Sequence, residues 1–317
     1  MLGFHRRMSE SSAIYEPMLT IGWVGQRPAD HRLAWQDGTP VPAAWRKAVV
    51  QRQLGCGVVV AMERRGFTIL DCSKWPPGVA HHGLPGIFTV DQLSEAAKPA
   101  LIARLRLANS LLTLLHAASM AKSNESPRVV RVHDRDLYRF DYPDESDEGY
   151  WYHPLGGGLP EVVTAADHHR IGVIPTSTVD LALDWLDMVV SAHALVPFDL
   201  LNQTQAALVT HDYGLAVVAG WTVCELQVRA RARTAGLQLS SRTPVAKVCS
   251  ELEKRDLLSK ELALRLATLR QGRNKWLHTD VEPDEATALE AVGLATAMLR
   301  SMIPGLTTRA MRGLVIL

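Results

Sequence analysis

The hydrophobic positions of the N-terminal half alternate in short runs that are typical of strands. Residues 58–62 and 67–70 are apolar-rich and are separated by Arg64, Arg65 and Gly66. This arrangement predicts a β-hairpin with a tight turn. A second extended pair is predicted at residues 129–133 and 137–142, with its turn at residues 134–136.

One long helix is predicted between the two extended pairs. It begins near Thr89, whose side chain can cap an amide, and continues to about Met120. Apolar residues recur along it at intervals of three and four, which predicts a stripe that packs on the strands. The positions of this stripe are Leu101, Leu105, Ala108, Leu112 and Leu115. The N-terminal half is therefore expected to be an α+β domain.

The pattern changes to a helical period after Thr176, and five amphipathic helices are predicted. The first follows Thr178 and is interrupted or kinked by Pro197. The others cover residues 212–234, a segment from 243, residues 260–277 and a segment with Pro283 in its first turn. Short loops between such helices favour an antiparallel bundle. The expected inward positions are Leu181, Trp185, Met188 or Val189, Ala192, Val217, Trp221, Cys224, Val228, Val245, Val248, Leu252, Leu262, Leu266, Leu269, Trp276, Leu289, Val292, Leu299 and Ile303.

An acidic, aromatic and glycine-rich stretch at residues 141–160 separates the two patterns and is expected to be an exposed loop or linker. The predicted organisation is an α+β domain over residues 1–174 and an all-α antiparallel bundle over residues 175–317. A length of 317 residues agrees with two domains, because it exceeds what one hydrophobic core usually serves.

Composition narrows the function only slightly. The chain has 34 Lys plus Arg against 33 Asp plus Glu, so its total charge points to no partner. Four cysteines without CxxC spacing favour neither a disulfide framework nor a zinc site, and they fit a reducing cytoplasm. The first residues lack an apolar run of signal-peptide length, and no segment approaches membrane-spanning length. Secretion and membrane insertion are therefore not expected.

Candidate chemistry is concentrated at the end of the fourth predicted helix of the bundle. Arg273 continues the inward stripe, where an unpartnered charge is costly. His278 would be rotated by about 140° from it on a continuous helix of 3.6 residues per turn. Unwinding of the helix end would bring His278 back beside the arginine, with Asn274 between them in sequence.

The segment Arg273-Asn274-Lys275-Trp276-Leu277-His278 resembles the Arg-x4-His signature of the HEPN superfamily. The likeness extends back to the apolar helix with Trp221 and Glu225, and forward to the Pro283-Asp284-Glu285 start of the last helix. It covers roughly 130 residues and leaves the N-terminal half without a recognised relative. The resemblance implies a HEPN-like bundle, metal-independent RNA cleavage without a cofactor, and roles in stress response, toxin systems or defence against phage.

The residue chemistry explains why this set could cleave RNA. Arg273 can hold a phosphate through two oxygens, and His278 can transfer a proton near neutral pH. Asn274 could orient either group, and Glu225 could hold Arg273 across the bundle. Arg270 and Lys275 add positive charge for RNA binding. Since one histidine cannot serve as both base and acid, a homodimer that joins two motifs is expected.

Other interpretations remain open. The bundle could be a non-catalytic dimerisation or partner-docking element, including one for a regulatory protein, or a nucleotide-binding regulator. Glu225 could simply be a partly buried carboxylate paired with an arginine. The glycine run at residues 156–158 lacks the Lys-Ser/Thr of a phosphate-binding loop. The pairs His81-His82 and His168-His169 lack metal-site spacing, so no metal is expected.

Overall fold

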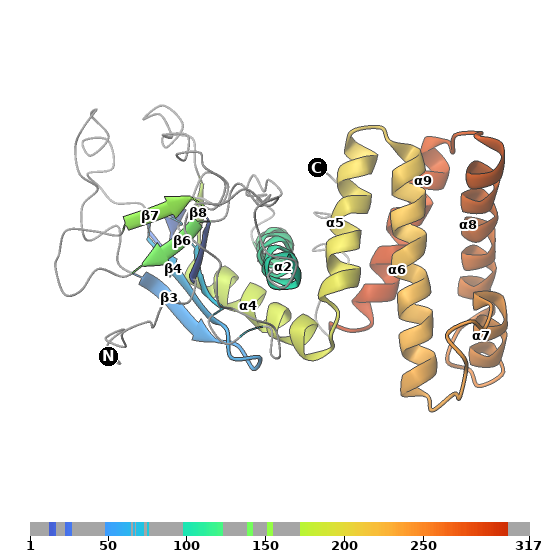
Figure 1. The fold of residues 1–317 in the computed structure, drawn as a ribbon, viewed down its shortest axis with the longest axis horizontal. Helices are drawn as coiled ribbons and strands as arrows, with labels where there is room; N and C mark the ends of the chain where they lie inside the picture. The colour runs from blue at the N-terminus through green and yellow to red at the C-terminus, as the bar shows by residue number, and fades with distance from the viewer. Residues whose placement is uncertain are drawn as a thin grey trace. The chain divides into compact units, whose positions relative to one another are not determined.

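A computed structural model describes residues 13–16, 23–26, 48–64, 66, 68–72, 75, 98–122, 138–141, 151–154 and 172–303. The chain forms two compact units, Met1–Ser191 and Ala192–Leu317. The first contains an antiparallel sheet with two helices, and the second is a bundle of five helices among the residues described (Figure 1). The succession of an α+β unit and a helical unit agrees with the prediction.

The sheet of the first unit has six strands in the order β3-β4-β5-β1-β6-β7, and each neighbouring pair is antiparallel. A separate parallel pair joins β2 (Trp23–Val24) to β8 (Val173–Ile174). The strands of the large sheet are β1 (Ala13–Glu16), β3 (Ala48–Gln53), β4 (Val59–Glu63), β5 (Thr68–Asp71), β6 (Tyr138–Asp141) and β7 (Trp151–Pro154).

The first predicted hairpin is confirmed as β4 and β5. Val60 lies opposite Leu70 in the antiparallel register, and both are almost fully buried. The turn closes where the Gly66 amide donates to the Glu63 carbonyl at 2.9 Å. Gly66 has a φ of +85°, a left-handed conformation that explains why glycine stands at this position.

The second predicted pair is only half right. Residues 138–141 form β6 as expected, but both edges of β6 are occupied by β1 and β7. Its expected partner, residues 129–133, lies outside the described residues. β7 comes from the stretch that we expected to be a loop or linker, so that prediction is wrong for Trp151–Pro154. A proline is tolerated there because β7 is the last strand of the sheet.

The long helix is α2 (Lys98–Lys122), which ends close to the predicted Met120. Its expected start at Thr89 lies outside the described residues. From Leu107 to Ser119 every residue is buried. This part of the helix is therefore buried on all faces, whereas only one apolar stripe was predicted. Leu105, expected inward, is only half-buried. The helix packs against α4 (Thr176–Ser191), and Lys122 Nζ donates to the Ser177 carbonyl at 2.6 Å.

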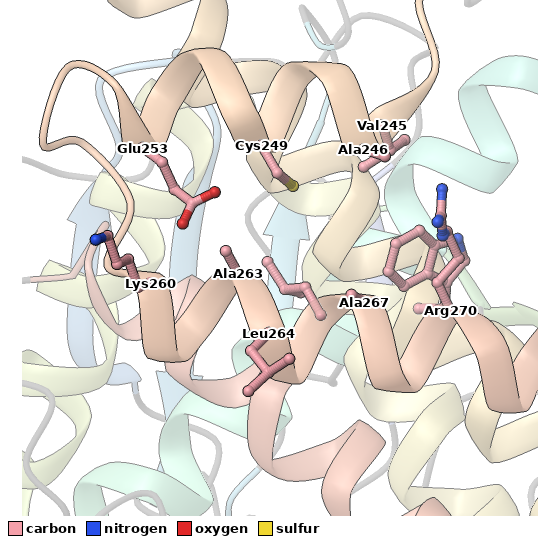
Figure 2. A pocket seen from close by; sticks show the side chains of 11 residues that line it. Val245, Ala246, Cys249, Glu253, Lys260, Ala263, Leu264, Ala267 and Arg270 are labelled. Atoms are coloured by element: carbon pink, nitrogen blue, oxygen red, sulfur yellow. The ribbon is translucent and has the colours of Figure 1, made fainter.

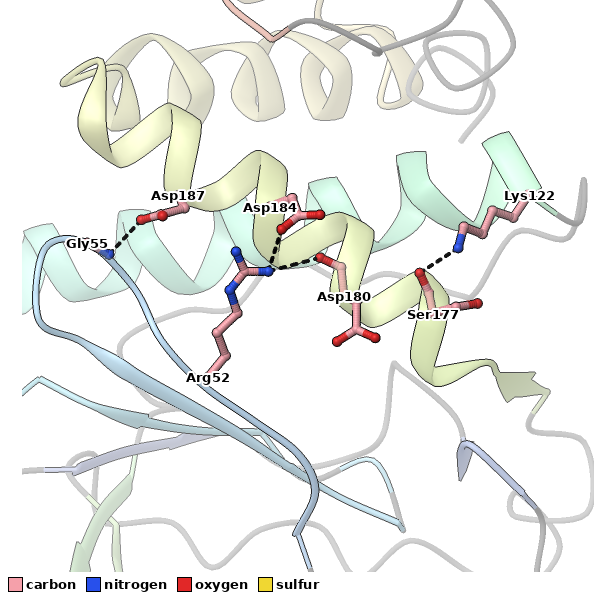
Figure 3. Close-up of polar contacts among 7 residues, drawn as sticks. All are labelled: Arg52, Gly55, Lys122, Ser177, Asp180, Asp184 and Asp187. Carbon is pink, nitrogen blue, oxygen red and sulfur yellow. Dashed lines mark hydrogen bonds and ion pairs between the residues drawn. The ribbon is translucent and has the colours of Figure 1, made fainter. Parts of the chain in front are cut away.

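Helix α4 belongs to the first unit, and polar contacts join it to β3 and to the turn after β3 (Figure 3). Arg52 forms an ion pair with Asp184, and the Gly55 amide donates to Asp187 Oδ1 at 2.7 Å. The compact units consequently divide after Ser191, whereas the composition change suggested a boundary near Thr176. On α4, Trp185 and Val189 are buried and Met188 is exposed; Ala192, expected inward, lies just after the helix and is exposed.

The second unit contains α5 (Leu195–Val209), α6 (Tyr213–Thr234), α7 (Val245–Glu253), α8 (Lys260–Thr279) and α9 (Glu285–Arg300). Helix α6 is central and packs against each of the other four (Figure 1). Helices α6 to α9 match the predicted segments within a few residues. The helix α5 was not predicted separately, because Pro197 was expected to interrupt a helix and instead lies buried in the first turn of one.

Glycines allow the helices around α6 to approach closely. At Gly220 an added Cβ would lie 3.0 Å from the Cβ of Ala291 on α9. At Gly214 it would overlap the indole ring of Trp276 on α8. Two details of α9 differ from prediction. Asp284 caps the helix, so Pro283 precedes it, and Leu289 is exposed while Ala288 is buried.

Candidate active site

The Arg-x4-His segment lies within the last two turns of α8. Ser259 caps the start of this helix by accepting the Leu262 amide at its hydroxyl, and the helix continues through Thr279. Asp280 ends it in a left-handed conformation with a φ of +53°, and its amide donates to the Trp276 carbonyl at 3.0 Å. The expected unwinding before His278 is therefore absent from the described α8.

Arg273 was predicted to face inward, and its side chain is half-buried. Its Nη1 donates to Asn274 Oδ1 at 2.9 Å, so the neighbouring amide fixes one side of the guanidinium. Its Nε is buried and has no hydrogen-bond partner among the residues that the structure describes. Because a buried donor without an acceptor costs free energy, this arrangement leaves Arg273 with unused capacity to bind an anion.

His278 lies on another face of the helix and is exposed. On a continuous helix its Cα is about 140° around the axis and about 7.5 Å along it from that of Arg273. Within the described part of the chain, no hydrogen bond or ion pair joins the two residues. One copy of the chain thus presents the arginine and the histidine at the same helix end but not side by side.

Glu225 pairs with Arg229 on its own helix. Arg229 Nε and Nη2 donate to Glu225 Oε1 at 3.1 Å and 2.9 Å. The carboxylate therefore does not hold Arg273 across the bundle, and the interpretation of a partly buried, arginine-paired carboxylate is confirmed.

Lys275 and Arg270, the expected RNA-binding residues, point in different directions. Lys275 is exposed and lies on the side of α9, where its charge contributes to a lowered pKa of the Asp284 carboxyl. The larger causes of that lowered pKa are hydrogen bonds from the Thr287 hydroxyl and amide. Arg270 is half-buried and faces α7, where its charge partly offsets the burial that raises the pKa of Cys249.

A histidine that the sequence reasoning missed lies at the same end of the bundle. His211 has a left-handed φ of +59°, and its Nδ1 lies 3.0 Å from the Tyr213 hydroxyl. The contact of Gly214 with Trp276 brings this start of α6 beside the end of α8. The signal in the sequence is Asp212, the N-cap of α6, which accepts the Leu215 amide at 2.9 Å and marks the turn.

A pocket of about 390 Å³ opens between α7 and α8 on the side that Arg270 faces (Figure 2). Trp221 of α6 forms part of its lining together with buried apolar side chains. Glu253 and Lys260 lie at one end of the pocket, and Arg270 lies at the other. The remaining lining residues are Val245, Ala246, Cys249, Ala263, Leu264, Leu266 and Ala267.

The described residues contain no cluster of three or more His, Cys, Asp or Glu side chains that could hold a metal ion. The pairs His81-His82 and His168-His169 lie outside them. No single helix among those described is long and apolar enough to cross a membrane; the consecutive helices α4 and α5 reach such a length and composition only when taken together, across a bend. No protein-family model matches the chain, and comparison with curated proteins and with solved structures found no match either.

Proposed function

We propose that this protein is a metal-independent endoribonuclease of the HEPN type, acting in the cytoplasm as a homodimer. The observation that carries the proposal is Arg273: an inward guanidinium at a helix end, fixed by Asn274, with a buried Nε that has no partner among the described residues. The Nε atoms of Arg64, Arg104 and Arg106 are also buried without a hydrogen-bond partner among the described residues, but of these four arginines only Arg273 lies near the end of a bundle helix that also carries a histidine. Arg273 fits the binding of a phosphate.

The reaction is a transesterification within the RNA. The substrate's 2′-oxygen attacks the adjacent phosphorus as its proton passes to a base, and the P–O5′ bond breaks as an acid protonates the leaving oxygen. The products are a 2′,3′-cyclic phosphate and a 5′-hydroxyl. Arg273 would stabilise the charge of the phosphorane, and the exposed imidazole of His278 would transfer a proton.

The separation of the two residues supports a shared site. Because α8 stays helical through Thr279, His278 of one copy cannot serve Arg273 of the same copy without a rearrangement of the helix end. A two-fold arrangement of two bundles would place the histidine of one copy beside the arginine of the other. Each of the two sites in the dimer would then take its arginine from one copy and its histidine from the other.

The test is cleavage of single-stranded and structured RNA by the purified protein in excess EDTA. We expect cleavage that persists in EDTA and leaves a 2′,3′-cyclic phosphate. Arg273→Ala and His278→Ala should each abolish it without change in fold, whereas Arg242→Ala, which removes an exposed arginine elsewhere on the bundle, should retain it. Cleavage that both site variants retain would overturn the proposal.

The second candidate is a non-catalytic HEPN-type module for dimerisation or partner docking. It is favoured by the separation of Arg273 and His278 on a continuous α8. This alternative predicts normal dimerisation with no RNA cleavage under any condition that supports folding. A partner that co-purifies and that the Arg273→Ala variant still binds would support it.

A further inference from the structure

The pocket between α7 and α8 contains charged side chains that no described residue pairs with. Within the part of the chain that the structure describes, the side chains of Arg270, Glu253 and Lys260 form no hydrogen bond or ion pair, although all three line the same pocket. Two other half-buried arginines of the bundle are paired: Arg229 with Glu225 and Arg265 with Glu290. The pocket thus combines apolar walls with unpaired charges, which is the usual composition of a site for a small organic ligand.

The walls leave room for a flat ring. Three of the lining residues, Ala246, Ala263 and Ala267, have the smallest side chain that a helix favours, and the volume of about 390 Å³ falls within the range of ligand pockets. Among the other apolar lining residues, Trp221 and Leu266 are 4% and 1% exposed, whereas Leu264 is 69% exposed. An aromatic or heteroaromatic ring would therefore replace water against these walls.

The charged groups are placed at opposite ends, as Figure 2 shows. Arg270 can bind an anionic oxygen at one end, because a guanidinium donates to phosphate through two parallel hydrogen bonds. At the other end Glu253 can accept a hydrogen bond from an amino group, and Lys260 can donate one to a carbonyl oxygen or ring nitrogen. This order of groups matches a nucleotide, with its phosphate at one end and its hydrogen-bonding base edge at the other.

Arg270 also connects the pocket to the candidate active site. It precedes Arg273 by three residues, so the two guanidiniums start about 4.5 Å apart along the axis and about 60° apart around it. Neighbouring phosphates of one RNA strand could engage these two arginines in succession. The pocket then receives the base next to the phosphate that Arg273 holds.

We propose that the α7–α8 pocket binds one nucleotide of the substrate, with the base against Trp221 and the phosphate at Arg270, and that it prefers a base with an exocyclic amino group. This inference rests on the proposed ribonuclease function for the role of the bound nucleotide. The geometry of the pocket does not depend on that function. The ligand is therefore a nucleoside phosphate, which can be supplied by RNA or as a free nucleotide.

The experiment measures binding calorimetrically, without cleavage. CMP, UMP and a single-stranded deoxyribonucleotide oligomer, which lacks the attacking 2′-hydroxyl, are titrated into the full-length wild type and three variants. Ala267→Leu fills the pocket with a good helix former, Arg270→Gln removes the phosphate ligand, and Glu253→Gln removes the acceptor charge. Ala206→Leu, at an exposed position of α5, is the matched control for the added side chain.

We expect wild type and Ala206→Leu to bind CMP more tightly than UMP. Ala267→Leu and Arg270→Gln should weaken CMP binding by about tenfold or more, because each removes ring contact or a charge-assisted hydrogen bond. Glu253→Gln should reduce or reverse the preference for CMP over UMP. The variants that weaken the binding of CMP should also weaken the binding of the oligomer.

Two results overturn the inference: no binding of either mononucleotide or the oligomer to wild type, or binding that Ala267→Leu and Arg270→Gln leave unchanged. If wild type cleaves RNA while the pocket variants bind and cleave normally, the pocket inference fails and the ribonuclease proposal stands. If the mononucleotides bind in the pocket but no RNA is cleaved and the oligomer does not bind, the nucleotide site is confirmed and the ribonuclease proposal fails.

Discussion

At the scale of single residues, Arg273 is stabilised less than its position would suggest. Its one hydrogen bond joins it to its sequence neighbour Asn274, and its Nε is buried without a partner in the described chain. A group that is retained at such a position at the expense of stability is typical of a functional site. The folded state therefore gains little from the charge.

The substitution Arg273→Met tests this reasoning. Methionine has a similar length and no polar atoms, so it removes the unsatisfied donor while it retains much of the packing. We expect the thermal midpoint to stay equal or rise by a few degrees, while RNA cleavage is lost. A loss of stability of more than about 2 kcal/mol would show instead that Arg273 mainly holds the helices together.

The capping residue Asp284 gives a pH-dependent prediction. Hydrogen bonds from Thr287 lower the pKa of its carboxyl from an ordinary value of 3.8, so the folded state favours the charged form. Stability from this group is present above the unfolded pKa and is lost as pH falls through the folded pKa. Asp284→Ala should therefore lower the melting temperature at neutral pH, and the difference should vanish well below pH 3.8. An equal difference at both pH values would contradict this origin.

At the scale of elements, the junction of α6 and α8 depends on one glycine. The indole of Trp276 occupies the space that a side chain at position 214 would take. Gly214→Ala should displace Trp276 and destabilise the protein by about 1–3 kcal/mol, the usual cost of overpacking. It should also weaken the site, because the Trp276 side chain holds the end of α8 against α6.

Two comparisons isolate this effect in denaturant unfolding. Gly293→Ala adds the same methyl group to α9 in open space, so it should be neutral or stabilise by about 0.5–1 kcal/mol through helix propensity. The double variant Gly214→Ala/Trp276→Leu should cost less than the sum of its single substitutions. Strict additivity would mean that the indole is not what position 214 contacts.

The elements that sequence patterns predicted are those with a clear period. Val217, Trp221, Cys224 and Val228 fall on one buried face of α6, as their spacing requires. Helix α5 gives no such pattern, because Thr204 and Gln205 are buried while Val196 and Val209 are exposed. The hydroxyl of Thr204 is satisfied within its own helix by donating to the Leu200 carbonyl at 2.7 Å, so burial of this polar side chain is tolerated.

The site was predictable in composition but not in geometry. The inward phase of Arg273 was predicted from its spacing to Leu269 and Trp276, and in the structure Leu269 is buried while Arg273 and Trp276 are half-buried. The position of His278 depended on where α8 ends, which is set by the left-handed cap at Asp280. The partner of Glu225 is Arg229, four residues later on the same helix, which is the spacing at which a glutamate and an arginine face each other. Tertiary packing also placed Arg270 in a pocket with Trp221 and Cys249.

At the scale of the whole molecule, the expected dimer makes two models of the active site distinguishable. In one model the two copies share each site, and in the other each site lies within one copy. The Arg273→Ala and His278→Ala variants should each be inactive alone. If each site takes its arginine from one copy and its histidine from the other, a mixed dimer of the two variants contains one intact site and one doubly defective site. If both residues come from the same copy, the mixed dimer contains no intact site.

Mixing the two variants after reversible dissociation therefore gives a quantitative result. Random pairing makes half of the dimers mixed, each with one of two sites intact, so we expect about a quarter of wild-type cleavage. Recovery should scale with the mixed fraction and should be absent when the variants are combined without dissociation. No recovery with confirmed mixed dimers would place Arg273 and His278 in the same copy, and the end of α8 beyond Trp276 would then have to unwind during the reaction.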